Sequence, residues 1–216
     1  MATQPERTAA ARQAIVTAAI EVLGTEGHRA LTNVRLQEVS GLSRGLVGYH
    51  FGARQGLLEA VVGSIRDDFI TDLVTSPEAR SAPGLQATVQ LADTYLAELA
   101  RDPRRNLAIM VLTVASIREI PELQPAIRQL NDGLRRGVAD LLGRGLADGS
   151  VRPGTDIPAA ATAIVAMLRG ATLQWLADPG GIDLDAARRE ITAILSRRYA
   201  APRPRPAAGV SRAGRG

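Results

Sequence analysis

Apolar residues recur at every third or fourth position along most of the chain, which is the pattern of amphipathic α-helices. No stretch shows the strict alternation of apolar and polar residues that is typical of a half-buried strand. The first helix is predicted over residues 8–26 and ends at Gly27, because glycine accepts the left-handed conformation of a helix C-terminus. Later helices are predicted over residues 54–75, 84–101, 104–118, 121–147, 156–177 and 184–199.

Two short helices joined by a sharp turn are predicted between the first helix and the helix that begins at residue 54. Thr32 is expected to cap the first of them through its hydroxyl. The residues predicted to face inward from that helix are Val34, Leu36 and Val39. Gly41 can adopt a positive φ and so permits the reversal, and Ser43 is expected to cap the second short helix, over 44–50. With these two, the chain is predicted to be an all-α protein of about nine helices.

The second short helix is unusual because it buries little beyond Val47. Its other side presents the side chains of Arg44, Leu46, Gly48, Tyr49 and His50. A helix that is mostly solvent-facing adds little to a core but suits insertion into a DNA major groove. The stretch is therefore interpreted as a helix-turn-helix, in which Gly45 and Gly48 leave room for the DNA to approach.

Proline and glycine mark the divisions of the chain. The Pro- and Gly-containing stretch 76–84 predicts a break between helices. We assign residues 1–53 to an N-terminal helix-turn-helix DNA-binding domain. Residues 54–200 are assigned to a second, helical domain, in which 54–75 form the connecting helix. The Arg-, Pro- and Gly-rich residues 201–216 are predicted to be a disordered tail.

Composition narrows the class further. The chain of 216 residues is 45% apolar but only 3% aromatic, which favours helices over a β-sandwich. It has no cysteine, so disulfides and thiolate metal sites are excluded. The net charge of +4 comes from four arginines in the last sixteen residues, so it is weak evidence for a nucleic-acid partner. The polar N-terminus and the short uncharged apolar runs predict a cytoplasmic protein without a signal peptide or membrane span.

Several ordered anchors coincide between Ala14 and Val61. They lie in the stretches "AIVTAAIEVLGTEGHRALT", "LQEVSGLSRGLVGYHF" and "GARQGLLEAVV". This set resembles the TetR-type transcriptional regulators. The C-terminal stretch "GATLQWLADPGGIDLDAARREI" is similar to the regulatory domain of the choline-responsive, BetI-like branch. The chain departs from the family pattern at Gln37 and Ser40, where Ala is usual, and at Gly48, where Tyr is usual.

The resemblance implies roles for named residues in DNA binding. Thr32 and Asn33 match the phosphate-contacting pair, and Arg54 matches the residue that clamps a phosphate. Arg44 is the best candidate to read a guanine, because a guanidinium pairs bidentately with O6 and N7. The other groove-facing positions are Gly45, Leu46, Gly48, Tyr49 and His50.

The helix at 156–177 is apolar on nearly every side and must be covered on every side. It is therefore predicted to form, with the helix at 184–199, one half of a four-helix bundle in a two-fold homodimer. The predicted interface residues are Ala163, Met167, Leu184, Ile191, Ile194 and Leu195. A larger monomeric core is the alternative. In a dimer, two recognition helices about 34 Å apart would read a palindromic operator in double-stranded DNA.

A mostly apolar cavity is expected among the helices at 84–147. The resemblance implies that it holds a small-molecule effector, which makes residues 54–200 an effector-binding and dimerisation domain. The predicted lining residues are Tyr95, Met110, Thr113, Ile117 and Trp175. The effector would favour a conformer in which the helix at 54–75 swings and the recognition helices no longer match the DNA. Its chemical identity stays open.

The sequence contains no motif that indicates an enzyme. There is no Gly-rich phosphate loop and no pair of histidines on a helix, so no catalytic residue, metal site or cofactor is predicted. Asp67, Asp68 and Asp72 are interpreted as a solvated face. The leading hypothesis is a ligand-responsive repressor. The alternatives are an activator of the same fold, or a helical small-molecule-binding protein that has lost DNA binding.

Overall fold

The computed structural model describes residues 3–202, and this range folds into ten α-helices, which confirms the all-α prediction. The helices are α1 (Gln4–Glu26), α2 (Asn33–Ser40), α3 (Arg44–Phe51), α4 (Arg54–Phe69), α5 (Pro77–Ser81), α6 (Gly84–Arg101), α7 (Arg104–Arg118), α8 (Gln124–Ala147), α9 (Ile157–Ala177) and α10 (Leu184–Tyr199). Short 3-10 segments occur at η1 (His28–Ala30) and η3 (Pro121–Leu123), and a π-helical segment at η2 (Ile70–Val74). The predicted disordered tail lies almost wholly outside the described residues.

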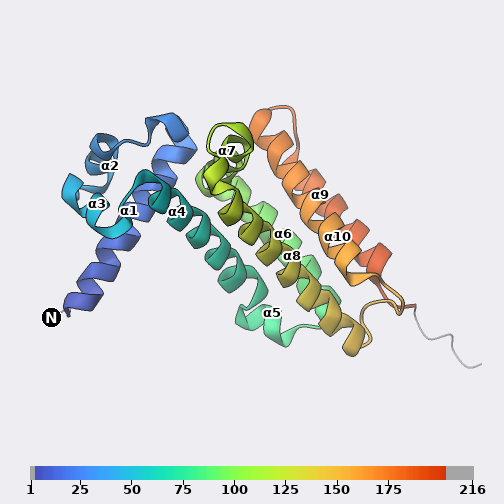
Figure 1. The fold of residues 1–216 in the computed structure, drawn as a ribbon. Coiled ribbons are helices and arrows are strands. Elements are labelled where there is room, and N and C mark those ends of the chain that lie inside the picture. Colours follow the sequence, from blue (N-terminus) through green and yellow to red (C-terminus); the bar gives the residue numbers. More distant parts are fainter. Residues whose placement is uncertain (1–2, 203–216) are drawn as a thin grey trace, which may run out of the picture.

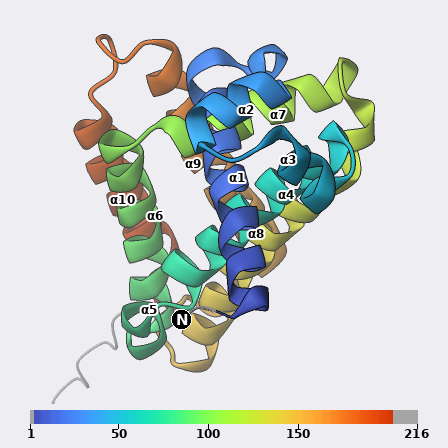
Figure 2. The same cartoon turned by 90° about the vertical axis from the view of Figure 1, so that its left-hand side faces the viewer.

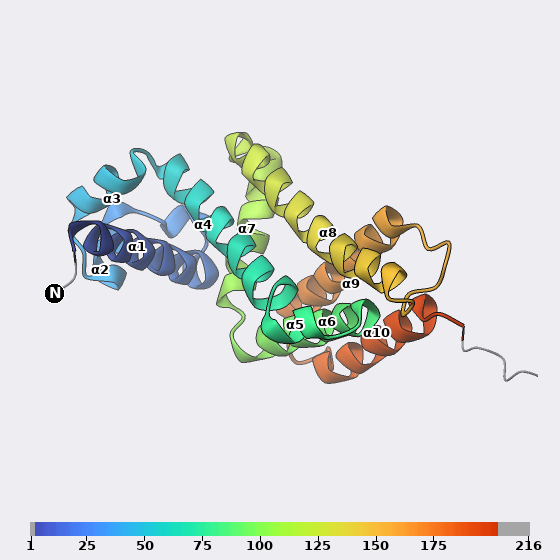
Figure 3. The ribbon, with the colours of Figure 1, turned by 90° about the horizontal axis from the view of Figure 1, so that it is seen from below.

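The helices are arranged from one end of the molecule to the other in three groups (Figure 1). Helices α1, α2 and α3 form a head at one end, and α4 runs from this head toward the rest of the chain (Figures 1 and 3). Helices α6 and α8 occupy the middle, while α9 packs on α8 and α10 packs on α6 as an outer layer at the far end. The view onto the head shows α2 and α3 on its surface (Figure 2).

Two hydrophobic clusters hold these groups together. The first joins the buried faces of α1–α4 to residues from α7 and from the beginning of α8, including Ile109, Leu112 and Leu130. The second joins α6, the rest of α8, α9 and α10, and includes Leu96, Leu142 and Ile164. The core of the head therefore extends beyond the predicted boundary at residue 53, because α4 and α7 contribute to it.

The head and the rest of the chain also meet closely at α1 and α7. A Cβ atom added to Gly24 of α1 would lie 2.6 Å from the carbonyl oxygen of Arg104. Only glycine permits this contact between the backbones. At the same place the Arg104 guanidinium lies 2.6 Å from Glu21 of α1 and 2.7 Å from Asp102. The hydrogen bonds from Arg104 lower the pKa of Asp102 to about 2.

Three expectations about the helices are corrected. The predicted helix over 54–75 is α-helical only to Phe69 and continues as the π-helical η2. The predicted break contains the short α5, which Pro77 opens and the Ser76 hydroxyl caps. Val34 and Val39 do not face inward: their side chains are 45% and 37% exposed. Leu36 is the only buried residue of α2, and Val34 lies about 200° around the helix from it.

Replacing Gly24 with alanine is expected to destabilise the protein by about 1–3 kcal/mol, because the new methyl group overlaps the backbone of Arg104. Gly63→Ala is the matched control. It lies inside α4 with no atom within 4 Å of an added Cβ, so it should stabilise by about 0.5–1 kcal/mol. Urea unfolding followed by circular dichroism measures both. Equal effects of the two substitutions would contradict the tight contact of α1 with α7.

Candidate functional site

The turn between α2 and α3 is built largely as the sequence predicts. The Thr32 hydroxyl accepts a hydrogen bond from the Arg35 backbone N–H at 3.2 Å and so caps α2. Gly41 adopts a φ of 70°, which makes the reversal possible. Ser43 differs from the prediction, because its side chain makes no capping bond. Instead its backbone carbonyl accepts from the Leu46 N–H at 3.0 Å, so α3 begins on backbone bonding alone.

Helix α3 displays most of its side chains to solvent, since Val47 is its only buried residue. Tyr49 is 77% exposed, the highest value among the large apolar side chains that remain on the surface. Arg44 is exposed and donates from Nε to the Gln37 side chain at 2.9 Å, which orients its guanidinium. Leu46 and His50 are half-buried, and Leu46 packs against the first hydrophobic cluster.

A hollow of about 580 Å³ lies on the head beside the N-terminal ends of α2 and α4. It brings together Thr32, Asn33, Gly48 and Arg54, four of the residues predicted to bind DNA. The first N–H groups of α2 and α4 lie at this hollow and favour an anion such as phosphate. The Arg54 guanidinium donates to the carbonyl oxygen of His28. Residues far apart in the sequence thus meet around one hollow.

The end of α7 reaches the same part of the head. Glu119, which follows α7, lies 3.1 Å from both Arg29 and His28 Nε2 of η1. The hydrogen bond from Arg29 lowers the pKa of Glu119. Together with the Glu21–Arg104 pair, α7 is therefore tied to the head at both of its ends.

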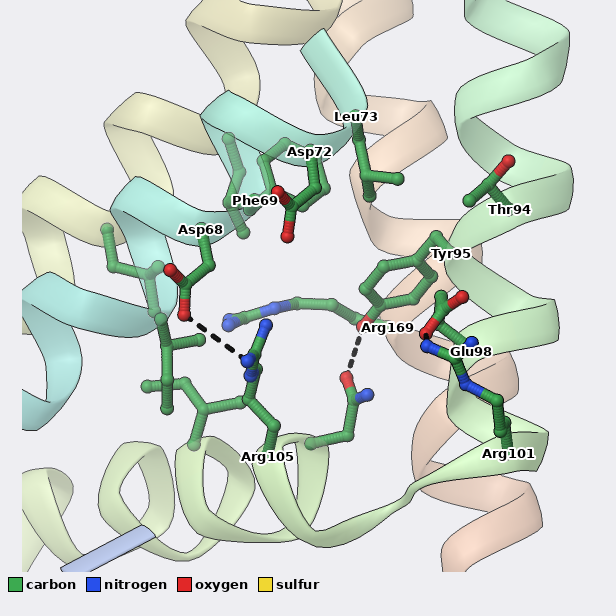
Figure 4. Close-up of a pocket in the computed structure, with 15 residues that line it drawn as sticks. Asp68, Phe69, Asp72, Leu73, Thr94, Tyr95, Glu98, Arg101, Arg105 and Arg169 are labelled. Atoms are coloured by element: carbon green, nitrogen blue, oxygen red, sulfur yellow. Dashed lines mark hydrogen bonds and ion pairs between the residues drawn. The ribbon is translucent and has the colours of Figure 1, made fainter. Parts of the chain in front are cut away.

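A second cavity, of about 380 Å³, lies between the head and the outer helices. Its walls come from α4, η2, α6, α7, α8 and α9 (Figure 4). The Tyr95 hydroxyl donates to Asn106 Oδ1 at 2.9 Å and accepts from the Thr172 hydroxyl at 3.3 Å. Burial raises the pKa of Tyr95, which keeps its hydroxyl protonated. The size and the mixed walls are those of a small-molecule site.

Charged residues line this cavity from several helices. Arg105 Nη2 of α7 lies 3.4 Å from Asp68 Oδ2 of α4, and Arg101 pairs with Glu98 within α6. Burial raises the pKa of Asp68, although Arg105 opposes this effect. Arg169 of α9 donates to Asn131 Oδ1 at 2.8 Å, and burial lowers its pKa. Asp72 lies at the same cavity with its side chain exposed.

The structure does not bring the five predicted cavity residues together. Tyr95 lines the cavity, whereas Met110, Thr113, Ile117 and Trp175 do not. Ile117 is 65% exposed, and Trp175 packs against the second hydrophobic cluster. Asp68 and Asp72 were expected on a solvated face, and both line the cavity, where Asp68 is half-buried and Asp72 is exposed as expected. Periodicity places these residues on one side of a helix but does not indicate which other helices face them.

The predicted dimer residues divide into two groups. Ala163 and Ile194 are exposed, and Met167 and Ile191 are half-buried. Leu184 and Leu195 have only 7% and 0% of their surface exposed, because they pack into the core of their own chain. These two leucines therefore have little surface left for a partner. Leu173 of α9, 55% exposed, is an apolar residue on the outer layer that the prediction omitted.

Within residues 3–202, no group of three or more His, Asp or Glu side chains is placed to hold a metal ion.

The fold and the head define the class of the protein as a helix-turn-helix regulator with a helical C-terminal domain. Residues 84–199 match the family described as the BetI-type transcriptional repressor C-terminal domain. Since this match covers more than half of the chain, the protein belongs to the BetI-type family of TetR transcriptional regulators, which is a family of regulators and not of enzymes.

Individual relatives agree with this assignment. The chain is 25% identical over 182 residues to BetI 1 of Chromohalobacter salexigens, which covers 82% of this chain and 85% of the relative. It is 28% identical over 87 residues to BetI of Rhizobium meliloti, covering 40% of this chain and 43% of that relative. The chain thus matches less than half the length of the second protein.

Solved structures show the same fold. A TetR-family regulator structure from Rhodococcus sp. superposes with a TM-score of 0.77 at 24% identity, covering 88% of this chain and 98% of that one. A regulator from Saccharomonospora viridis, solved in complex with choline, superposes with a TM-score of 0.72 at 18% identity, covering 89% of this chain and 98% of that one.

Thr32→Ala is expected to destabilise the protein by about 1 kcal/mol, because the α2 cap is lost. Ser43→Ala should change the stability by less than about 0.5 kcal/mol, because the Ser43 hydroxyl caps nothing. Thermal and urea unfolding of the two variants measure the difference. A larger effect at Ser43 than at Thr32 would show that the hydroxyl of Ser43 caps α3 after all.

Proposed function

We propose that this transcriptional regulator is a homodimeric, cytoplasmic repressor that binds a palindromic operator through α3 and is released by a small-molecule effector. The observation that carries the proposal is the outward display of α3, with an exposed Arg44 and Tyr49 and two glycines among its eight residues.

The two glycines of α3 serve no packing purpose inside the chain. A Cβ atom added to Gly45 or Gly48 would have no atom within 4 Å. Each glycine nevertheless weakens a helix by roughly 0.5–1 kcal/mol relative to alanine. The space beside Gly45 and Gly48 is therefore useful only to a molecule outside the chain, and a DNA backbone is the partner that a helix-turn-helix brings this close.

Phosphate binding is assigned to the hollow at the N-terminal ends of α2 and α4. Thr32 and Asn33 provide polar side chains there, and Arg54 provides a cation. In the free protein Arg54 donates to the carbonyl oxygen of His28, so this guanidinium is already held at the edge of the hollow. His50, half-buried at the end of α3, adds a further donor.

Dimerisation is assigned to α9 and α10. By length and composition α9 is apolar enough to cross a membrane, yet only 28% of its most apolar window is buried in the chain. A single helix of this kind is weak evidence for a membrane span, and α9 packs along α8 with Arg169 bonded to Asn131 of that helix. A second copy of α9 and α10 would cover the apolar residues that remain exposed, including Leu173 and Ile194.

The release of the protein from its operator by the effector is assigned to the cavity and to α7. Arg104 and Arg105 are consecutive: Arg104 pairs with Glu21 of the head, and Arg105 pairs with Asp68 of α4 at the cavity. A ligand that changes the Arg105–Asp68 contact therefore acts on α4 and on the helix that holds the head. To shift the population of the DNA-binding conformer from 99% to 1%, the ligand must prefer the other conformer by about 5.5 kcal/mol.

Arg44→Ala is expected to weaken binding to the operator about tenfold to hundredfold, because a bidentate contact with a guanine is lost. Gly48→Ala should also weaken binding, by closing the space beside α3, while it stabilises the free protein by about 0.5–1 kcal/mol. The operator is first obtained by sequencing genomic DNA fragments that the pure protein retains. Fluorescence anisotropy on such a fragment then measures each variant.

The matched controls are Arg80→Ala, an exposed arginine of α5, and Gly143→Ala, an α8 glycine with no atom near an added Cβ. Neither should change the affinity for DNA. If a dimer neutralises about six phosphates, the logarithm of the affinity falls with the logarithm of salt concentration at a slope near −5. The repressor proposal is contradicted if the protein retains no specific DNA fragment, or if Arg44→Ala binds the fragment as tightly as the parent protein.

Leu173→Asp combined with Ile194→Asp is expected to convert the dimer to a monomer, because two charges would be buried against the partner helices. Val34→Asp is the control, since Val34 is similarly exposed but lies on the head. Sedimentation velocity measures the mass of each variant. Two outcomes would count against the assigned interface: a monomeric parent protein, or a double variant that remains dimeric.

A further inference from the structure

The cavity lined by Tyr95, Asp68 and Arg169 contains six charged side chains, and four of them form ion pairs with one another. Asp68 pairs with Arg105, and Glu98 pairs with Arg101. Two charged residues of the lining remain, Asp72 of η2 and Arg169 of α9. Asp72 is exposed to solvent, so water can solvate its carboxylate, whereas Arg169 is half-buried. The lining thus holds three acids and three arginines, and Arg169 is the arginine among them without a carboxylate partner.

Within residues 3–202, no carboxylate lies within 4 Å of the Arg169 guanidinium. The guanidinium donates one of its five N–H groups to the neutral side chain of Asn131. Among residues 3–202, the buried side-chain atoms that lack a hydrogen-bond partner are Arg144 Nε and Arg188 Nε. No nitrogen of Arg169 is among them, so its unbonded N–H groups are accessible to solvent or to a ligand. Figure 4 shows the Arg169 side chain extending across the cavity, from the side of Tyr95 toward Asp68 and Arg105.

The rest of the lining is unsuited to a quaternary ammonium group. Such cations are recognised by the faces of several aromatic rings. This cavity contains two rings, Phe69 and Tyr95, which meet edge to face at 6.3 Å, and Trp175 is not part of the lining. The Tyr95 hydroxyl is already bonded to Asn106 and Thr172. Apolar side chains such as Ile65, Ile109 and Leu134 complete the walls.

We propose that the cavity binds a small amphipathic carboxylate, whose carboxylate group pairs with Arg169 and whose apolar body lies against Phe69 and the walls of α4, α7 and α8. A half-buried guanidinium without a counter-ion is costly, and a carboxylate supplies both the charge and the two acceptors that its fork of N–H groups fits. The cavity of about 380 Å³ limits the ligand to a small one. The inference rests on the proposed effector site and assigns a ligand class different from the choline held by the relative from Saccharomonospora viridis.

The test measures binding to the full chain without DNA, so its failure is separate from a failure of DNA binding. The probes are straight-chain carboxylates of four to ten carbons and phenyl-substituted carboxylates of similar size. Each is compared with its neutral amide and with choline, by thermal shift and titration calorimetry. At least one carboxylate should raise the melting temperature, and its amide should bind about tenfold more weakly or worse. Choline should have no effect.

Three variants complete the test. Arg169→Met should lose the response to the carboxylate, Arg169→Lys should keep part of it, and Arg128→Met should keep it fully, because Arg128 is exposed on α8 away from the cavity. Comparing a carboxylate with its amide on the parent protein needs no variant to fold. The proposal is overturned if no carboxylate binds, if amide and carboxylate bind equally, if choline binds instead, or if Arg169→Met binds the carboxylate as the parent does.

Discussion

The close contact of α1 with the beginning of α7 is the constraint on which the rest of the structure depends. Gly24 lets the two backbones meet, and Glu21 holds Arg104 beside that contact. Because α7 is tied to the head at Arg104 and again at Glu119, the head cannot turn freely on the C-terminal helices. The position of α3 relative to the outer helices α9 and α10 is therefore set by backbone packing together with a few ion pairs on the surface.

This constraint also explains why the cavity is placed where it can influence the head. The cavity touches α4, α7 and the beginning of α8, which all contribute to the head's core and also reach the C-terminal helices. The neighbouring residues Arg104 and Arg105 point to different parts of the molecule, because consecutive helical positions differ by about 100°. The first turn of α7 thus contacts both the cavity and the head.

The sequence predicted the elements well and the tertiary contacts poorly. Gly41 and Thr32 act as their local chemistry requires, because turns and caps depend on neighbouring residues. The cavity depends instead on how six elements meet. Of the four residues outside it, Met110, Ile117 and Trp175 have apolar side chains that fit a core or a surface as well as a pocket, and the Thr113 hydroxyl bonds within its own helix. Asp68 looked like part of a charged face, since its partner Arg105 lies on a different helix and has no fixed spacing from it. Leu184 and Leu195 looked like interface residues because periodicity cannot separate an intramolecular partner from a second copy.

The π-helical η2 affects the rotation of the preceding part of the chain relative to the following part, about the helix axis. The buried stripe of α4 runs through Leu58 and Ile65 and continues to the half-buried Phe69 at helical spacing. The next buried residue is Val74, five positions beyond Phe69. The wider π turn keeps Val74 on the inner side and leaves Asp72 and Leu73 at the cavity. Loss of one residue here would rewind the segment to α-helical geometry and rotate everything before it by about 100°. The chain can thus accept substitutions in this segment far more readily than a change in its length.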